Sequence, residues 1–160
     1  MNQELEKIYR EDIEDRKREN QYWDNPKINK EINRKDQERK TRVKQLIKKG
    51  LLKEAVDYHH AALIFQHGET SGDFKKAHEL AKKALAMGDN TARWLFASTL
   101  DRYLLSKGKA QKFGTQFKQN EKGRWELAQP IDPKTTDKER TKYSVPPLKD
   151  ALKVFKEKHG

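Results

Sequence analysis

The chain has 160 residues, enough for one domain of ordinary size. Only 33% of the residues are hydrophobic and 38% are charged, so the core must be compact and part of the chain well solvated. Cysteine is absent, which excludes disulfides and thiolate metal sites, and no run approaches the roughly 18 apolar residues of a membrane span. The first residues also lack the apolar core of a signal peptide, so the sequence predicts a cytoplasmic location and no membrane partner.

The net charge of +11 is spread unevenly along the chain. Lys and Arg outnumber Asp and Glu by 15 to 11 in residues 1–50, by 8 to 7 in residues 51–108 and by 13 to 7 in residues 109–160. This pattern predicts a packed central body, a mixed-charge N-terminal arm and a basic C-terminal part that attracts phosphates.

Two charged helices are expected in the first 50 residues. The first, over residues 2–19, carries only a thin apolar stripe that includes Leu5 and Ile8, and Asn25-Pro26 ends the run. We expect this arm to be helical but poorly anchored. The second helix spans about residues 27–49, and Gly50 suits its C-terminal cap.

Three more helices form the expected body. The helix over about residues 52–67 is apolar around nearly its whole circumference, which is typical of a buried helix. Thr70 and Asp73 resemble a capping box that opens a fourth helix, and Gly88 closes it. Asp89 or Asn90 then caps a fifth helix over about residues 91–107.

The periodicity changes after Gly108. Residues 112–117 and 124–127 flank a turn-like segment and predict a short β-hairpin. Thr136 and Glu139 are spaced to cap one helical turn, and a last amphipathic helix follows Pro146-Pro147. The fold class is therefore mainly α: residues 1–50 lead into a core of residues 51–160 with a small C-terminal hairpin, within one domain.

The stretch over residues 72–94, GDFKKAHELAKKALAMGDNTARW, resembles one helical hairpin of a tetratricopeptide or Sel1-type repeat. No second copy occurs, and a stable solenoid needs about three repeats, so the likeness implies local packing of two helices. A non-enzymatic protein-interaction module built on this hairpin is one of the functions we consider.

A broader resemblance runs from about Asp36 to Leu152. It is to an uncharacterised bacterial family, the domain-of-unknown-function family 6624, whose QH, DR, Q and GTQ elements correspond here to Gln66-His67, Asp101-Arg102, Gln111 and Gly114-Thr115-Gln116. Because that family has no settled activity, the resemblance implies which positions matter and says little about their chemistry.

The same polar residues predict a ligand site if their helices pack together. His67 is the candidate acid/base, Asp101 the group that fixes its tautomer, and Arg102 a bidentate clamp for phosphate or carboxylate. The remaining ligand-binding candidates are His60, Gln66, Gln111, Thr115 and Gln116. The function expected on this basis is binding of an anionic, nucleotide-like ligand, with acid/base hydrolysis as a further step.

Three alternatives remain open. The same groups can form a buried hydrogen-bond network that only holds the fold. A metal site on His60 with Asp57 or Asp101 lacks any HExxH or HxH spacing, so no metal or other cofactor is predicted. Sequence-independent nucleic-acid binding is the third, because aromatic side chains alternate with basic ones on the hairpin; its basic residues are Lys112, Lys118, Lys122 and Arg124.

Overall fold

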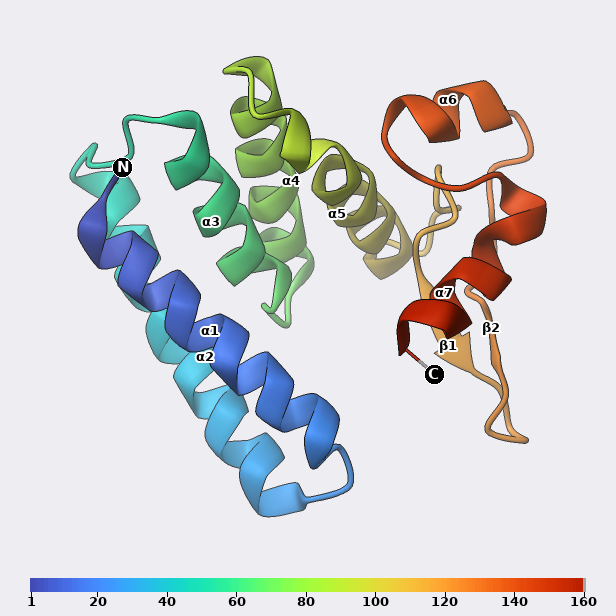
Figure 1. Cartoon of the computed structure of the whole chain (residues 1–160), viewed down its shortest axis with the longest axis horizontal. Helices are drawn as coiled ribbons and strands as arrows, with labels where there is room; N and C mark the ends of the chain where they lie inside the picture. The colour runs from blue at the N-terminus through green and yellow to red at the C-terminus, as the bar shows by residue number, and fades with distance from the viewer. Residues whose placement is uncertain (160) are drawn as a thin grey trace.

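The computed structural model describes residues 1–159 and confirms a mainly helical fold with a small two-stranded antiparallel sheet (Figure 1). The α-helices are α1 (Gln3–Gln21), α2 (Pro26–Lys48), α3 (Ala55–Gln66), α4 (Ser71–Ala86), α5 (Arg93–Ser106), α6 (Asp137–Lys142) and α7 (Ala151–His159). Short 3₁₀ turns, η1 (Asn90–Ala92) and η2 (Leu148–Asp150), lead into α5 and α7. The strands are β1 (Phe117–Gln119) and β2 (Trp125–Leu127).

Local capping chemistry sets several of these helix boundaries. At the start of α4 the hydroxyl of Thr70 accepts the N–H of Asp73, and the Asp73 carboxylate accepts the N–H of Thr70. Thr136 and Glu139 form the same reciprocal pair at the start of α6. Both capping boxes were predicted, and each satisfies N–H groups that the first helical turn leaves without partners.

The first helix is firmly anchored, contrary to the expectation of a poorly anchored arm. α1 lies antiparallel to α2 and also contacts α3 (Figure 1). The apolar stripe of α1 is thin but packs into the core, since Leu5 is 0% exposed and Ile8 is 8% exposed. The same face buries Asp12 and Asp15, whose charges are met by arginines described below.

Helices α3, α4 and α5 form the body, with α4 packed between the other two (Figure 1). Alanines make the close approach possible: Ala61 and Ala62 of α3 and Ala77 and Ala81 of α4 are 0% exposed. Larger apolar side chains complete this main core from both sides, among them Leu5, Val43, Leu46, Ile64, Phe65, Leu80 and Leu95.

The C-terminal part lies against α5, on the side away from α1 and α2 (Figure 1). A second, smaller apolar cluster forms there from Ala97, Phe113 and Val145. The first strand lies later in the chain than predicted, because residues 112–116 are a loop and β1 spans Phe117–Gln119, which overlaps the predicted strand only at Phe117. Helix α7 packs on β2, and the ring of Phe155 stacks on Phe117 with centroids 4.1 Å apart.

Candidate functional site

Asp101 holds the loop that precedes β1. Its Oδ1 accepts the backbone N–H groups of Lys112 at 2.7 Å and Phe113 at 2.8 Å, and its Oδ2 accepts the N–H of Thr115 at 3.0 Å and its hydroxyl at 2.7 Å. The side chain is 0% exposed. Burial raises the pKa of Asp101 above its ordinary value, although the N–H donors oppose this. A carboxylate enclosed in this way serves as an anchor for the loop.

Gln111 closes the same loop onto the second strand. Its Nε2 donates to the carbonyls of Gln116 and Ala128, at 3.2 and 2.5 Å, and its Oε1 accepts the N–H of Gln116 at 3.0 Å. Gly114 has a φ of +81°, and a Cβ there would lie 3.1 Å from the Leu148 side chain. The residues of the Q and GTQ elements therefore define one tightly bonded loop.

Arg102 lies beside this loop, and its guanidinium has neutral partners only. Its Nη1 donates to the carbonyl oxygen of Gln66, the last residue of α3, at 2.7 Å. Its Nε donates to the side-chain oxygen of Gln116 at 3.2 Å. Among residues 1–159 no carboxylate lies within 4.0 Å of Arg102, and burial lowers the pKa of this guanidinium. The positive charge is offset by the partial negative charge of the α3 C-terminus and by the face of the Phe74 ring, whose centroid lies 5.7 Å from the guanidinium carbon.

Gln66 is unusual because its side-chain oxygen is buried without a partner. The residue is 6% exposed, its Oε1 is inaccessible, and the carboxamide forms no hydrogen bond with any described residue. Leaving a buried amide unpaired costs about 1–3 kcal/mol. An unpaired carboxamide on the residue that Arg102 contacts is the kind of polar group that a bound ligand satisfies.

His67 does not join this group. Its Nδ1 lies 3.1 Å from Oδ1 of Asp12 on α1, so the predicted pairing of His67 with Asp101 is not formed. The physical reason is that all four bonds of the Asp101 carboxylate go to the loop. The structure thus brings together Gln66, Asp101, Arg102, Gln111, Thr115 and Gln116, and places His67 and His60 on the face of α3 that meets α1.

Asp12 and His67 belong to a charged cluster between α1, α2 and the end of α3. One side-chain ligand atom from each of Asp12, Asp36 and His67 lies within 4.8 Å of the others, a donor set suited to a cation. The arginines already occupy it: Arg16 Nη2 donates to both oxygens of Asp36 at 2.6 and 2.7 Å, and Arg39 Nη1 donates to Asp36 at 2.9 Å. We assign the cluster to helix packing, since its carboxylates are balanced by guanidinium groups.

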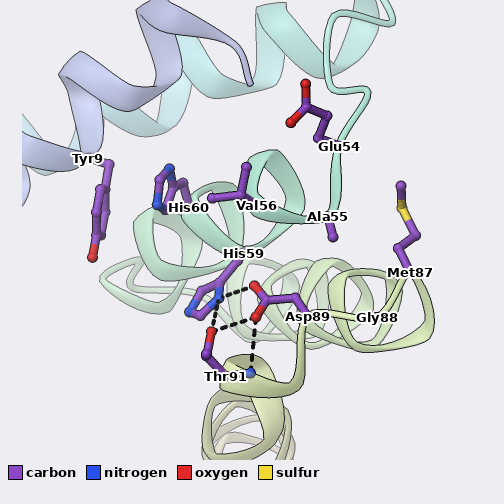
Figure 2. A pocket seen from close by; sticks show the side chains of 10 residues that line it. All are labelled: Tyr9, Glu54, Ala55, Val56, His59, His60, Met87, Gly88, Asp89 and Thr91. Atoms are coloured by element: carbon purple, nitrogen blue, oxygen red, sulfur yellow. Dashed lines mark hydrogen bonds and ion pairs between the residues drawn. The ribbon is translucent and has the colours of Figure 1, made fainter.

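His60 lies in a separate pocket of about 520 Å³, whose lining does not include Arg102 (Figure 2). Its ring stacks on Tyr9 of α1, with centroids 3.8 Å apart. Its Nδ1 is buried and unbonded, because the Glu6 carboxylate, 3.2 Å away, lies outside hydrogen-bond geometry. Burial lowers the pKa of His60. The pocket is lined by Tyr9, Glu54, Ala55, Val56, His59, His60, Met87, Gly88, Asp89 and Thr91.

The same pocket contains a histidine–aspartate pair that the sequence did not single out as a site. His59 Nδ1 lies 2.6 Å from Oδ2 of Asp89, and the Thr91 hydroxyl donates to the other Asp89 oxygen at 2.5 Å (Figure 2). From the sequence Asp89 is explained as a helix cap, a role it does play by accepting the N–H of Thr91. Only the folded chain shows that this cap also faces His59, 30 residues earlier.

The aromatic residues of the hairpin are largely used in packing. Phe117 stacks on Phe155, and Trp125 meets the same ring edge-on at 5.0 Å. Of the basic residues, Lys118 lies 3.9 Å from Glu126 and Lys112 lies 4.0 Å from Glu139. Lys122 and Arg124 remain on the exposed turn. Phe117 and Trp125 therefore pack against α7, although Trp125 is still 40% exposed.

Among residues 1–159, no helix combines the length and apolar character needed to cross a lipid bilayer. Comparison of the chain with protein-family models, with curated proteins and with solved structures finds no significant match. The resemblances drawn from the sequence therefore stay predictions.

Proposed function

We propose that this protein binds a small phosphate-bearing anion at Arg102, with the carboxamides of Gln66 and Gln116 as neighbouring polar groups. The observation that carries the proposal is the half-buried guanidinium without a carboxylate partner. A charge removed from water costs several kcal/mol unless an opposite charge compensates it. A phosphate oxygen at the guanidinium would supply that compensation through charge-assisted hydrogen bonds.

The surroundings support an anion in preference to other ligands. Residues 109–160, which form the loop and hairpin beside Arg102, carry 13 Lys and Arg against 7 Asp and Glu. This excess attracts anions over a distance of about 10 Å at ordinary ionic strength. The neighbouring carboxamide of Gln66 has both donor and acceptor capacity, so it suits the mixed hydrogen-bonding pattern of a nucleotide-like ligand.

The proposal is limited to binding. Hydrolysis was expected to use His67 with Asp101, but Asp12 takes the place of Asp101 beside His67, and Asp101 is enclosed by the loop. Neither group is arranged to move a proton to or from a ligand at Arg102, because a general acid or base must reach that ligand directly or through one water.

Thermal melts with added anions test the proposal. Inorganic phosphate, mononucleotides and cyclic nucleotides at about 100 times their dissociation constant should stabilise the wild type by about 2.7 kcal/mol, which raises Tm by about 5–10 °C. Arg102→Met should lose this increment. Arg93→Met is the matched control, because Arg93 lies exposed on the same helix and its guanidinium hydrogen-bonds to Asn90 alone among residues 1–159.

A second variant separates ligand binding from folding. Gln66→Leu keeps the backbone carbonyl that Arg102 contacts and removes the unpaired carboxamide. We expect its stability without ligand to be unchanged or higher, while anion affinity falls, because sites kept for binding often cost the fold some stability. If no anion shifts the wild type and Arg102→Met simply lowers stability, then Arg102 only caps α3 and the proposal fails.

A further inference from the structure

The pocket between α1, the first half of α3 and the segment 87–91 is a site of its own. His59 and His60 lie seven or six residues before Gln66, about 10 Å away along the helix. Its volume of about 520 Å³ falls within the usual range for small-molecule sites. None of the residues of the proposed anion site lines this pocket.

His59 presents a fixed hydrogen-bonding group to the pocket. The pKa of Asp89 is lowered, since hydrogen bonds from Thr91 and His59 outweigh the opposing effect of burial, so Asp89 is ionised. An ionised carboxylate only accepts, and His59 Nδ1 must therefore carry the proton that joins the two groups. Its other nitrogen, Nε2, forms no hydrogen bond with a described residue and is left for a ligand (Figure 2).

The pair is arranged for binding and not for nucleophilic catalysis. In a catalytic triad the nucleophile hydroxyl and the orienting carboxylate contact opposite nitrogens of the histidine. Here the Thr91 hydroxyl donates to Asp89 and lies 3.4 Å from His59 Nδ1, the same nitrogen that Asp89 contacts. Thr91 is thus held away from Nε2 and has no base to activate it.

The charges of the lining decide which ligand the pocket suits. Glu54 and Asp89 line it, Glu6 lies behind His60, and neither lysine nor arginine is among the lining residues. Glu54 already contacts one ammonium group, the N-terminal amine of Met1. An anion would meet repulsion here, whereas an ammonium group would find carboxylates.

The rest of the lining suits the organic part of such a ligand. Tyr9 and His60 form a stacked aromatic pair, and aromatic faces attract cations. Ala55, Val56 and Met87 supply apolar contacts.

We infer that this pocket binds a small organic cation that carries one or more primary ammonium groups, one of which donates to Nε2 of His59. The carboxylates of Glu54 and Asp89 make the pocket electrically negative for the ammonium group, and the hydrocarbon part rests on Ala55, Val56 and Met87. The whole protein carries a net charge of +11, so its long-range electrostatic field repels such a ligand, and only a specific site would hold it.

Isothermal titration calorimetry with 1,4-diaminobutane tests the inference, with 1,4-butanediol as a neutral control of the same length. The diamine should bind the full chain with a dissociation constant below about 1 mM, and the diol at least tenfold more weakly. Equal binding of both compounds would overturn the assignment of a cation. Absence of diamine binding would overturn the site altogether.

Variants then locate the binding. His59→Gln should weaken diamine binding at least tenfold, and Ala55→Leu should do the same by filling the pocket. Glu69→Gln is the control, because it removes a carboxylate that lies outside the lining. Circular dichroism checks that each variant is folded. Diamine binding that survives both pocket variants would overturn the location.

The two proposed sites can fail separately. Phosphate binding should persist in His59→Gln, and diamine binding should persist in Arg102→Met. If Arg102→Met abolished diamine binding while the protein stayed folded, the diamine would not bind in the pocket of His59. That result would overturn the cation site and leave the proposal of an anion site unaffected.

Discussion

Replacing Asp101 by asparagine tests how the C-terminal part is held to α5. The isosteric amide keeps one oxygen, which can still accept the N–H groups of Lys112 and Phe113. The other position becomes an NH₂ group facing the N–H of Thr115, while the Thr115 hydroxyl can turn to accept from it. One hydrogen bond is lost, two donors face each other, and the remaining bonds lose their charge assistance.

The magnitude follows from these contacts. Hydrogen bonds to a charged group contribute about 1.5–3 kcal/mol each, against about 0.5–1.5 for neutral ones. Losing one of the four bonds and weakening the other three costs about 4–7 kcal/mol. Part of this cost is recovered, because the variant no longer buries a charge. We expect Asp101→Asn to lower the free energy of unfolding by about 2–4 kcal/mol, a large share of the 5–15 kcal/mol typical of a domain.

Urea unfolding followed by circular dichroism measures this change. Asp24→Asn is the control, because Asp24 lies exposed at the turn between α1 and α2 and its side chain forms no hydrogen bond with a described residue. A loss below about 0.5 kcal/mol in Asp101→Asn, equal to the control, would refute the reasoning, since exposed substitutions fall in that range. It would mean that the loop stays bound without the carboxylate.

Two further predictions concern the fold as a whole. Gly68→Ala should cost more than about 2 kcal/mol in urea unfolding, because its Cβ would lie 2.4 Å from Cβ of the buried capping residue Asp73, whereas Gly72→Ala, with its nearest atom at 3.6 Å in a helix, should gain about 0.5–1 kcal/mol. Equal changes in unfolding free energy for Gly68→Ala and Gly72→Ala would contradict the close approach of Gly68 to Asp73. Burial lowers the pKa of His60 and His78 below 6.5, so the unfolded chain takes up protons first as the pH falls. Unfolding free energies measured from pH 8 to pH 5 should therefore fall below about pH 6.5, and a His60→Gln, His78→Gln double variant should flatten that slope.

The sequence predicted most helices because their boundaries depend on local chemistry. The two residues of a capping pair such as Thr70 and Asp73 lie three positions apart in the sequence. Their hydrogen bonds start the helix without a partner from a distant part of the chain. The anchoring of α1 on α2 and α3 could not be predicted from local sequence patterns. Burial of Asp15 depends on Arg39, 24 residues later, whose guanidinium meets its carboxylate between the two helices.

The candidate site was predicted in part for the same reason. Hydrogen bonds link Arg102 to Gln116 and Asp101 to Thr115, because α5 leads directly into the loop they hold. Convergence of these residues around one cavity stays a prediction. His67 was assigned to the same group but turns to α1, since adjacent residues of a helix point to different faces. The pair of His59 with Asp89 joins two helix ends, and only the packing of α3 against the segment after α4 brings them together.

The enclosure of Asp101 has a consequence for the order in which a growing chain is built. The main core draws on α1 to α5, so it can assemble before residues 111–145 have been synthesised. At that stage the face of α5 that will later be covered carries a hydrated carboxylate among Phe96, Ala97 and Leu100. We expect this charge to limit association of the incomplete surface with other nascent chains. In the complete chain the loop replaces the water around the carboxylate with three N–H donors and one O–H donor.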